Sequence, residues 1–426
     1  MEFARRLQCD DANSLAAPTP ELALMPPLPR TVWVLGLVSL LMDFSSELIH
    51  GLLPIYLTVT LGVGVAALGW IEGVAEATAS IVKVFSGALS DALGKRKPLL
   101  LFGYGLAALT KPLFPLASGA GLVFAARLLD RVGKGIRGAP RDALVADVTP
   151  SAQRGAAFGL RQALDTVGAV LGPLAAIALL TGLFGAATDV RGALWFAVLP
   201  ALAAWLLLLL LVREPAAAAS GATQAPPGID RAPRLRWADA RSFNADYWVI
   251  VALGAVFTLA RFSEAFLVLR VSAYDASPLW GPAAIATMSM VYAIASYPAG
   301  LLADRIDVRG LLAAGLVVLI AADAVLACAT SPWWALAGAA LWGLHMGLTQ
   351  GVLSALVAGT APATLRGSAF GVFNLVSGAM LLAASVLAGA LWQYVSPVAT
   401  FVTGGVLCFF TLLGLRWVRP LRPGQT

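Results

Sequence analysis

Residues 143–159 read ALVADVTPSAQRGAAFG, and residues 355–371 read ALVAGTAPATLRGSAFG. The two segments lie 212 positions apart and share ten of their seventeen residues, which makes chance a poor explanation. A second echo lies upstream, where Gly87-x-x-x-Asp91 recurs after 213 positions as Gly300-x-x-x-Asp304. Because the chain has 426 residues, the repeat period is half its length. The sequence therefore predicts two structurally equivalent halves.

The composition places both halves in lipid. The chain is 59% hydrophobic and 12% charged, whereas soluble domains carry about 25% charged residues. A helix needs about 20 apolar residues to cross about 30 Å of hydrocarbon. Twelve such segments occupy residues 31–59, 65–89, 98–117, 120–147, 155–183, 192–212, 246–271, 280–303, 309–329, 332–359, 366–391 and 397–418. We predict an all-α polytopic membrane protein whose twelve transmembrane helices form two six-helix pseudo-symmetric bundles, an architecture typical of transporters.

The distribution of basic residues predicts the orientation of the chain, because Lys and Arg in short loops stay on the cytoplasmic side. Alternate loops and the central linker carry these residues, and the opposite loops offer only Arg191. We therefore expect a multi-pass protein of a bacterial-type plasma membrane with both termini in the cytoplasm. The expected domains are a tail (1–30), an N-terminal bundle (31–212), a linker (213–245), a C-terminal bundle (246–418) and a tail (419–426).

The expected partners follow from the same composition. The net charge of +6 is explained by the loop bias, so no nucleic-acid partner is expected. Three cysteines support neither a disulfide framework nor a thiolate metal site. We expect a monomer in the lipid bilayer that binds a small-molecule or ion substrate and protons, and that needs no cofactor.

The repeat changes the length expected for the fourth helix. Hydropathy alone ends it near Leu129, because a run of charged residues follows. Its partner segment in the second half is almost wholly apolar, so the repeat predicts a helix that continues to about Ala146. Within it, a stripe of cations shares one face: Arg127, Arg131, Lys134 and Arg141. A charge at the bilayer centre costs about 2.5–3.5 kcal/mol, so the stripe must face other helices or water.

The segment Gly87-Ala-Leu-Ser-Asp91-Ala-Leu-Gly94-Lys95-Arg96-Lys97 resembles the signature loop of the major facilitator superfamily, with Ala92 in place of the usual basic residue. The second copy keeps Asp304 and Arg305 but has Asp307 where glycine is usual. The resemblance covers nearly the whole chain. It implies that the loop acts as a conformational latch, in which Asp91 meets the start of the eleventh helix near Gly367.

Two further motifs are similar to that family. Arg131-x-x-Lys134-Gly135 resembles its fourth-helix motif, which the family links to proton coupling, although Lys134 replaces a more usual Gln. The small residues of the fifth helix resemble the antiporter motif of family exporters, without its closing glycine pair: Gly159, Gly168, Gly172 and Pro173. Close helix packing is an alternative explanation of these small residues.

Ionisable residues in the first two helices are the main candidates for coupling. Asp43, Glu47 and His50 share one face of the first helix, and Glu72 and Glu76 share one face of the second. Counting helical rise places Asp43 level with Glu76, and Glu47 level with Glu72. Two rungs of carboxylates could meet near the midplane and share protons. Neutralisation by Arg or Lys is the alternative, and the Arg161–Asp165 spacing supports it.

The C-terminal half is sparser in polar residues. Candidates for its side of a pocket are Arg261, Glu264, His345, Gln350 and Asn374, with Trp342 and Phe373 as apolar walls. Coupling chemistry is therefore expected mainly in the N-terminal half, on Asp43, Glu47, His50, Glu72, Glu76, Arg131, Lys134, Arg161 and Asp165.

These features favour a proton-coupled exporter that works by alternating access. A divalent-metal exporter of the Ni, Co or Fe type is a second hypothesis, since Asp43, Glu47 and His50 offer oxygen and imidazole ligands. Organic anion uptake is a third, given the cationic stripe. No nucleophile elbow, paired-histidine motif or phosphate loop is present, so an enzyme is not expected. A sensor that kept the fold without transport stays open.

Overall fold

The computed structural model describes residues 28–150, 153–183, 189–213, 243–275, 277–303, 307–349, 352–360 and 366–417. The expected tails, most of the linker, and Asp304, Arg305 and Gln350 lie outside these residues, as does the side chain of Asp91. The described residues form helices joined by short turns and no strand. The prediction of an all-α fold is confirmed.

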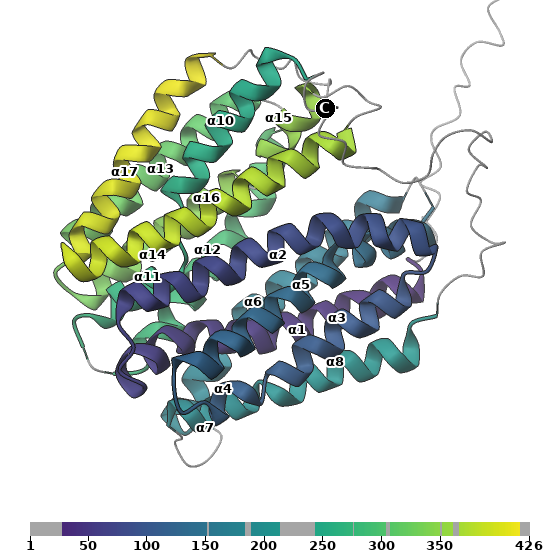
Figure 1. The fold of residues 1–426 in the computed structure, drawn as a ribbon, viewed down its shortest axis with the longest axis horizontal. Helices are drawn as coiled ribbons and strands as arrows, with labels where there is room; N and C mark the ends of the chain where they lie inside the picture. The colour runs from purple at the N-terminus through teal and green to yellow at the C-terminus, as the bar shows by residue number, and fades with distance from the viewer. Residues whose placement is uncertain are drawn as a thin grey trace, which may run out of the picture.

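The N-terminal half forms one group of helices (Figure 1). Its elements are α1 (Arg30–Ile55) with the π-helical turn η1 (Tyr56–Thr60), α2 (Val65–Leu93), α3 (Lys97–Thr110), α4 (Leu113–Leu116), α5 (Ala120–Val148), α6 (Arg154–Thr181), α7 (Val190–Phe196) and α8 (Val198–Leu211). Pro112 lies between α3 and α4, and Pro200 lies in the first turn of α8, just after α7 ends. Each pair of helices is interrupted there because proline lacks the amide that would continue the helical hydrogen bonds.

The C-terminal half forms the second group. Its elements are α10 (Ala245–Ala260), α11 (Ala265–Ser272), α12 (Trp280–Ala303), α13 (Val308–Cys328), α14 (Pro332–Thr349), α15 (Val352–Thr360), α16 (Arg366–Tyr394), α17 (Pro397–Gly414) and the 3₁₀ turn η4 (Leu415–Trp417). In the described part of the chain, nine helical stretches are long and apolar enough to cross a membrane by length and composition. The remaining passes run through α5, α12 and α14, which carry charged, aromatic or small residues.

The α5 helix extends to Val148, as the repeat predicts and hydropathy does not. Gly135 of α5 packs against α2, where an added Cβ would lie 2.7 Å from Val82. Its counterpart Gly347 of α14 packs against α12, with Ala295 at the same 2.7 Å. The two halves therefore repeat one close helix contact at equivalent positions.

Two turns identify the ends of the molecule. Gly62 precedes α2 and Gly94 follows it, and both have a positive φ, which glycine adopts without strain. We call the two ends of the bundles the Gly62 end and the Gly94 end. Helix α2 lies beside α16 across the boundary between the two groups (Figure 1), and α1 and α6 contact α12 there.

The groups meet tightly at the Gly62 end. A Cβ on Gly69 of α2 would lie 2.4 Å from the carbonyl oxygen of Ser385 on α16. A Cβ on Gly281 of α12 would lie 2.5 Å from the carbonyl oxygen of Gly51 on α1. The amide of Ala66 donates a 2.8 Å hydrogen bond to Gln393. Backbone contact between the groups therefore depends on glycine at this end.

Candidate functional site

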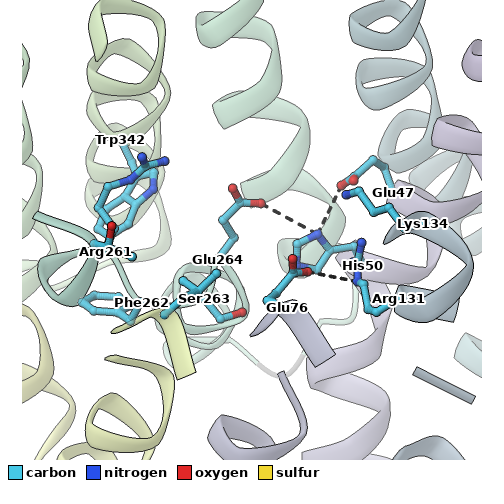
Figure 2. A pocket seen from close by; sticks show the side chains of 12 residues that line it. Glu47, His50, Glu76, Arg131, Lys134, Arg261, Phe262, Ser263, Glu264 and Trp342 are labelled. Atoms are coloured by element: carbon cyan, nitrogen blue, oxygen red, sulfur yellow. Dashed lines mark hydrogen bonds and ion pairs between the residues drawn. The ribbon is translucent and has the colours of Figure 1, made fainter. Parts of the chain in front are cut away.

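A cavity of about 320 Å³ lies between the two groups of helices. Its walls are contributed by α1, α2 and α5 on one side and by α14, α16 and the segment between α10 and α11 on the other (Figure 2). The lining side chains are Glu47, His50, Glu76, Arg131, Lys134, Thr258, Arg261, Phe262, Ser263, Glu264, Trp342 and Leu381. We call this space the central cavity.

The C-terminal wall exists because one predicted helix is broken. The sequence predicts a single helix over residues 246–271, but α10 ends at Ala260 and α11 begins at Ala265. Neither Gly nor Pro lies in the interruption, which holds Arg261, Phe262, Ser263 and Glu264. The Ser263 hydroxyl accepts a 3.3 Å hydrogen bond from the amide of Ala265, the first residue of α11. The break turns all four side chains toward the central cavity.

His50 joins the two halves of the cavity. Its Nδ1 lies 3.2 Å from Glu47 Oε2 on the same helix and 3.8 Å from Glu264 Oε2 on the other wall. Figure 2 shows the imidazole between these two carboxylates. The second ring nitrogen of His50 is buried without a hydrogen-bond partner among the described residues. A proton that moves within this cluster changes the attraction between the two groups of helices.

The cationic stripe of α5 faces other helices and the cavities, as its cost in lipid requires, and its first two arginines pair with α2. Arg127 lies 2.7 Å from Glu72, and Arg131 lies 3.0 Å from Glu76. Across the cavity, Ser263 donates a 3.4 Å hydrogen bond to Glu72. Glu72 and Glu76 are thus neutralised by arginines, rather than pressed against the carboxylates of α1 as the rung hypothesis proposes. A neighbouring buried pair, Lys111–Asp130 at 2.9 Å, holds α5 against the end of α3.

A second cavity, of about 440 Å³, lies toward the Gly94 end. It shares Glu76 and Lys134 with the central cavity. Its other charged side chains are Asp43, Lys83, Arg137, Arg141 and Asp165. Both cavities therefore lie on the Gly94 side of the tight contact between the two groups of helices.

Ion pairs of α5 and α6 border this second cavity. Arg161 forms a hydrogen-bonded ion pair with Asp165, as the sequence spacing suggests. Arg141 lies 3.2 Å from Asp142 and 3.6 Å from Asp165, and donates a 3.0 Å hydrogen bond to Ser39. Asp43, one of the metal candidates, lines this cavity and not the central one. The described residues contain no group of three or more His, Cys, Asp or Glu side chains placed to hold a metal ion.

The predicted latch is described only in part. Arg96 donates a 2.7 Å hydrogen bond to Ser90 and lies 3.4 Å from Asp147 of α5. Gly94 supplies the left-handed turn, and Lys95 is exposed. Gly87 faces Ala139 of α5, 3.4 Å from an added Cβ. These contacts hold the loop against α5, while the role expected for Asp91, Asp304 and Arg305 stays a prediction.

The small residues of α6 bring it close to α1. A Cβ on Gly168 would lie 2.3 Å from the carbonyl oxygen of Leu40, and one on Gly172 2.5 Å from that of Phe44. Pro173 is buried beside them. Gly159 has no atom within 4 Å of an added Cβ. Close packing therefore accounts for Gly168 and Gly172, whether or not the motif also serves antiport.

The C-terminal candidates are dispersed. Arg261 and Glu264 line the central cavity, His345 is buried beside Trp342, and Asn374 is partly buried on α16. Asp323, which is buried in α13, was not among the candidate residues predicted from the sequence. A signal was present, because Asp323 is the one acid in an otherwise apolar predicted span, 309–329. Ser263 of the central cavity and Tyr292 of the second cavity were not predicted either, because no charge or motif identifies them.

Comparisons with known proteins agree with this architecture. The family model described as "Major Facilitator Superfamily" matches residues 35–290 and 272–426. The uncharacterised transporter MJ1317 of Methanocaldococcus jannaschii, described as MFS-type, is 31% identical over 399 residues, covering 92% of this chain and 95% of that protein. The multidrug resistance protein MdtH of Photorhabdus laumondii is 31% identical over 170 residues, 38% of this chain and 42% of its own.

Among solved structures, the nucleoside transporter NupG has a TM-score of 0.73 at 14% identity, covering 91% of this chain and 99% of its own. A likeness at this identity shows the fold. Together with the family match and the cavity between two similar halves, it confirms the resemblance seen in the sequence and the prediction that the chain is not an enzyme. This chain belongs to the Major Facilitator Superfamily and is a multi-pass membrane transporter.

Proposed function

We propose that this transporter couples substrate movement to proton movement, as a proton antiporter that exports a small molecule by alternating access. The observation that supports the proposal is His50, which lies between Glu47 and Glu264 of the two walls. Histidine is the side chain whose charge changes most readily near neutral pH. A ligand shifts a two-state equilibrium only if it interacts differently with the two states, and a proton shared across the walls satisfies that condition.

The proposed direction of transport is export, and the proposed location is the plasma membrane. Export is supported by MdtH, whose name describes it as a multidrug resistance protein. We also propose a monomer in the plasma membrane, with both termini in the cytoplasm and the linker at 213–245. With that orientation, the Gly94 end and the second cavity face the cytoplasm. The coupling groups are the His50 cluster, with the ion pairs of Glu72, Glu76, Arg131 and Asp165 as its support.

Replacing Glu47 with glutamine is expected to abolish uphill transport and to leave exchange of substrate for substrate intact. The variant keeps the shape of the side chain but lacks the charge that faces His50. The measurement uses inside-out vesicles from a bacterial host without its major efflux pumps, with an imposed pH gradient and a panel of dyes and antibiotics. Asp275→Asn is the matched control, because Asp275 lies in the loop between α11 and α12. Full proton-driven transport in Glu47→Gln would remove Glu47 from the mechanism.

A second candidate, proton-linked uptake of an organic anion, is favoured by two cations. Lys134 and Arg261 line opposite walls of the central cavity, and neither side chain forms an ion pair or hydrogen bond with any of the described residues. Phe262 and Trp342, 5.2 Å apart between ring centroids, supply an aromatic surface beside Arg261. Protonation makes such a cavity more positive, so an anion and a proton would bind together and move in the same direction.

Neutralising either cation is expected to weaken binding of such an anion about tenfold to a hundredfold, the effect of losing one charged hydrogen bond of about 1.5–3 kcal/mol. The probes are an aromatic carboxylate and the amide of the same ring system, compared by exchange in proteoliposomes for wild type, Lys134→Gln and Arg261→Gln. Arg191→Gln is the control, since Arg191 is exposed and donates to the Ala117 carbonyl outside both cavities. Equal exchange of carboxylate and amide would exclude the anion candidate.

A further inference from the structure

Asp323 has an ionisable side chain that is buried inside the C-terminal group of helices, outside both cavities. It lies in α13 and is 1% exposed. Neither carboxylate oxygen has a hydrogen-bond partner among the described residues. Every other buried carboxylate described above is close to a cation, so Asp323 is held in a different way.

The surroundings of Asp323 are defined by the glycine pair of α17. A Cβ built on Gly404 would lie 2.8 Å from Asp323 Oδ2, 3.3 Å from the carbonyl oxygen of Ala260 and 3.2 Å from a ring carbon of Phe262. A Cβ built on Gly405 would lie 3.7 Å from the Asp323 Cβ. The carboxylate therefore occupies a notch that only residues as small as glycine leave open.

Two hydrogen-bond acceptors border this notch, Asp323 Oδ2 and the carbonyl oxygen of Ala260. Ala260 is the last residue of α10, and the carbonyls at the C-terminal end of a helix carry partial negative charge. An ionised carboxylate beside that end, out of water, costs several kcal/mol unless something positive joins it. A proton on Asp323 removes the charge and supplies the donor that the two acceptors lack.

The titratable neighbours of Asp323 provide no resident cation. Cys408 of α17 is buried beside it and carries no positive charge. Arg261 follows Ala260 directly, but it lines the central cavity, where its guanidinium lies 5.4 Å from the centroid of the Phe257 ring. Phe262 lines the central cavity and also borders the notch, so its ring lies between the two.

We propose that Asp323 is a second proton-binding site, distinct from the His50 cluster, which holds a proton in this conformation and exchanges it with the central cavity past Phe262. On release, the O–H bond of the carboxylic acid breaks, the proton passes to water in the cavity, and the carboxylate keeps the electron pair. Arg261, one residue from Ala260, is the cation able to join that carboxylate when the break between α10 and α11 moves. This inference rests on the proposed proton coupling and adds a site in the other half.

The test is infrared spectroscopy of the purified protein in lipid at neutral pH. A carboxylic acid gives a carbonyl band that a carboxylate lacks, so wild type should show a band that is lost in Asp323→Asn and retained in Glu264→Gln. In heavy water the band should shift slowly in wild type and much faster in Phe262→Ala. An unchanged band in Asp323→Asn would overturn the site. Equal exchange rates in wild type and Phe262→Ala would overturn the proposed route.

Asparagine is a neutral side chain of nearly the same shape, so Asp323→Asn should fold, and its thermal unfolding temperature checks this. Should it not fold, Asp323→Ser provides the same spectral comparison. In proteoliposomes, Asp323→Asn should move fewer protons per substrate than wild type, as measured with an internal pH dye. If wild type moves no protons with substrate, the proposed coupling fails while the infrared result still decides whether Asp323 holds a proton. An unchanged ratio of protons to substrate would exclude Asp323 from coupling.

Discussion

Replacing Arg127 with methionine is expected to destabilise the folded protein by about 3–5 kcal/mol, the cost of removing one partner of a buried ion pair. Arg127 and Glu72 are each 1% exposed and lie 2.7 Å apart. Without Arg127, Glu72 keeps a single described hydrogen bond, the 3.4 Å contact from Ser263. Methionine retains much of the length of the side chain, so the loss reports the stranded charge more than a cavity.

The control is a double variant in which the buried site is again electrically neutral. Glu72→Gln in the Arg127→Met background removes the stranded charge and should recover most of the lost stability. Arg191→Met is a matched single variant, because Arg191 is exposed and contacts the Ala117 carbonyl at 3.3 Å; we expect it to cost less than about 1 kcal/mol. Unfolding is followed by tryptophan fluorescence in detergent. Equal losses in the single and double variants would attribute the effect to packing instead of charge.

Replacing Gly69 with valine is expected to hold the two groups of helices apart at the Gly62 end and to stop transport. The added Cβ would lie 2.4 Å from the Ser385 carbonyl oxygen, a distance at which backbone must move. Helices of membrane proteins approach this closely only through small residues. Because alternating access requires that each end close in turn, a wedge at this end removes one of the two states.

The separation can be measured with spin labels at Val59 and Tyr394, which are exposed side chains on either side of the Gly62 end. We expect a longer distance in Gly69→Val than in wild type. Gly121→Val is the control, since Gly121 lies in α5 with no atom within 4 Å of an added Cβ. Gly121→Val makes the same glycine-to-valine change in a helix as Gly69→Val, but its side chain meets no neighbouring helix. An unchanged distance in Gly69→Val, or equal loss of transport in both variants, would contradict the proposed closure.

The fold could be predicted from the sequence where two independent patterns agreed. Hydropathy finds most of the spans, and the repeat supplies the one that hydropathy shortens, since α5 reaches Val148 despite its charges. The break at residues 261–264 could not be predicted, because no Gly or Pro marks it. It is stabilised by contacts that exist only after folding, such as the hydrogen bond from Ser263 to Glu72 and the packing of Phe262 on Trp342.

Most charged side chains of the candidate site were predicted from the sequence, but the contacts between them were not. Helical spacing correctly grouped Glu72 with Glu76 on one face of α2, and Arg127 with Arg131 on one face of α5. It could not state which faces meet, because the rotation of a helix about its axis depends on its neighbours. For the same reason the partner of His50 across the cavity, Glu264, did not follow from the sequence, nor did the isolation of Asp323.

The charges of α5 also bear on how the chain enters the membrane during synthesis. Alone, a helix that carries Arg127, Asp130 and Arg131 within its span would partition poorly into lipid. The groups that neutralise these three residues, Glu72, Glu76 and Lys111, all precede α5 in the chain. They have therefore left the ribosome before α5 does. The order of the sequence lets α5 enter the membrane beside α2 and α3, which have already been synthesised, so that these three charges need never face lipid unpaired.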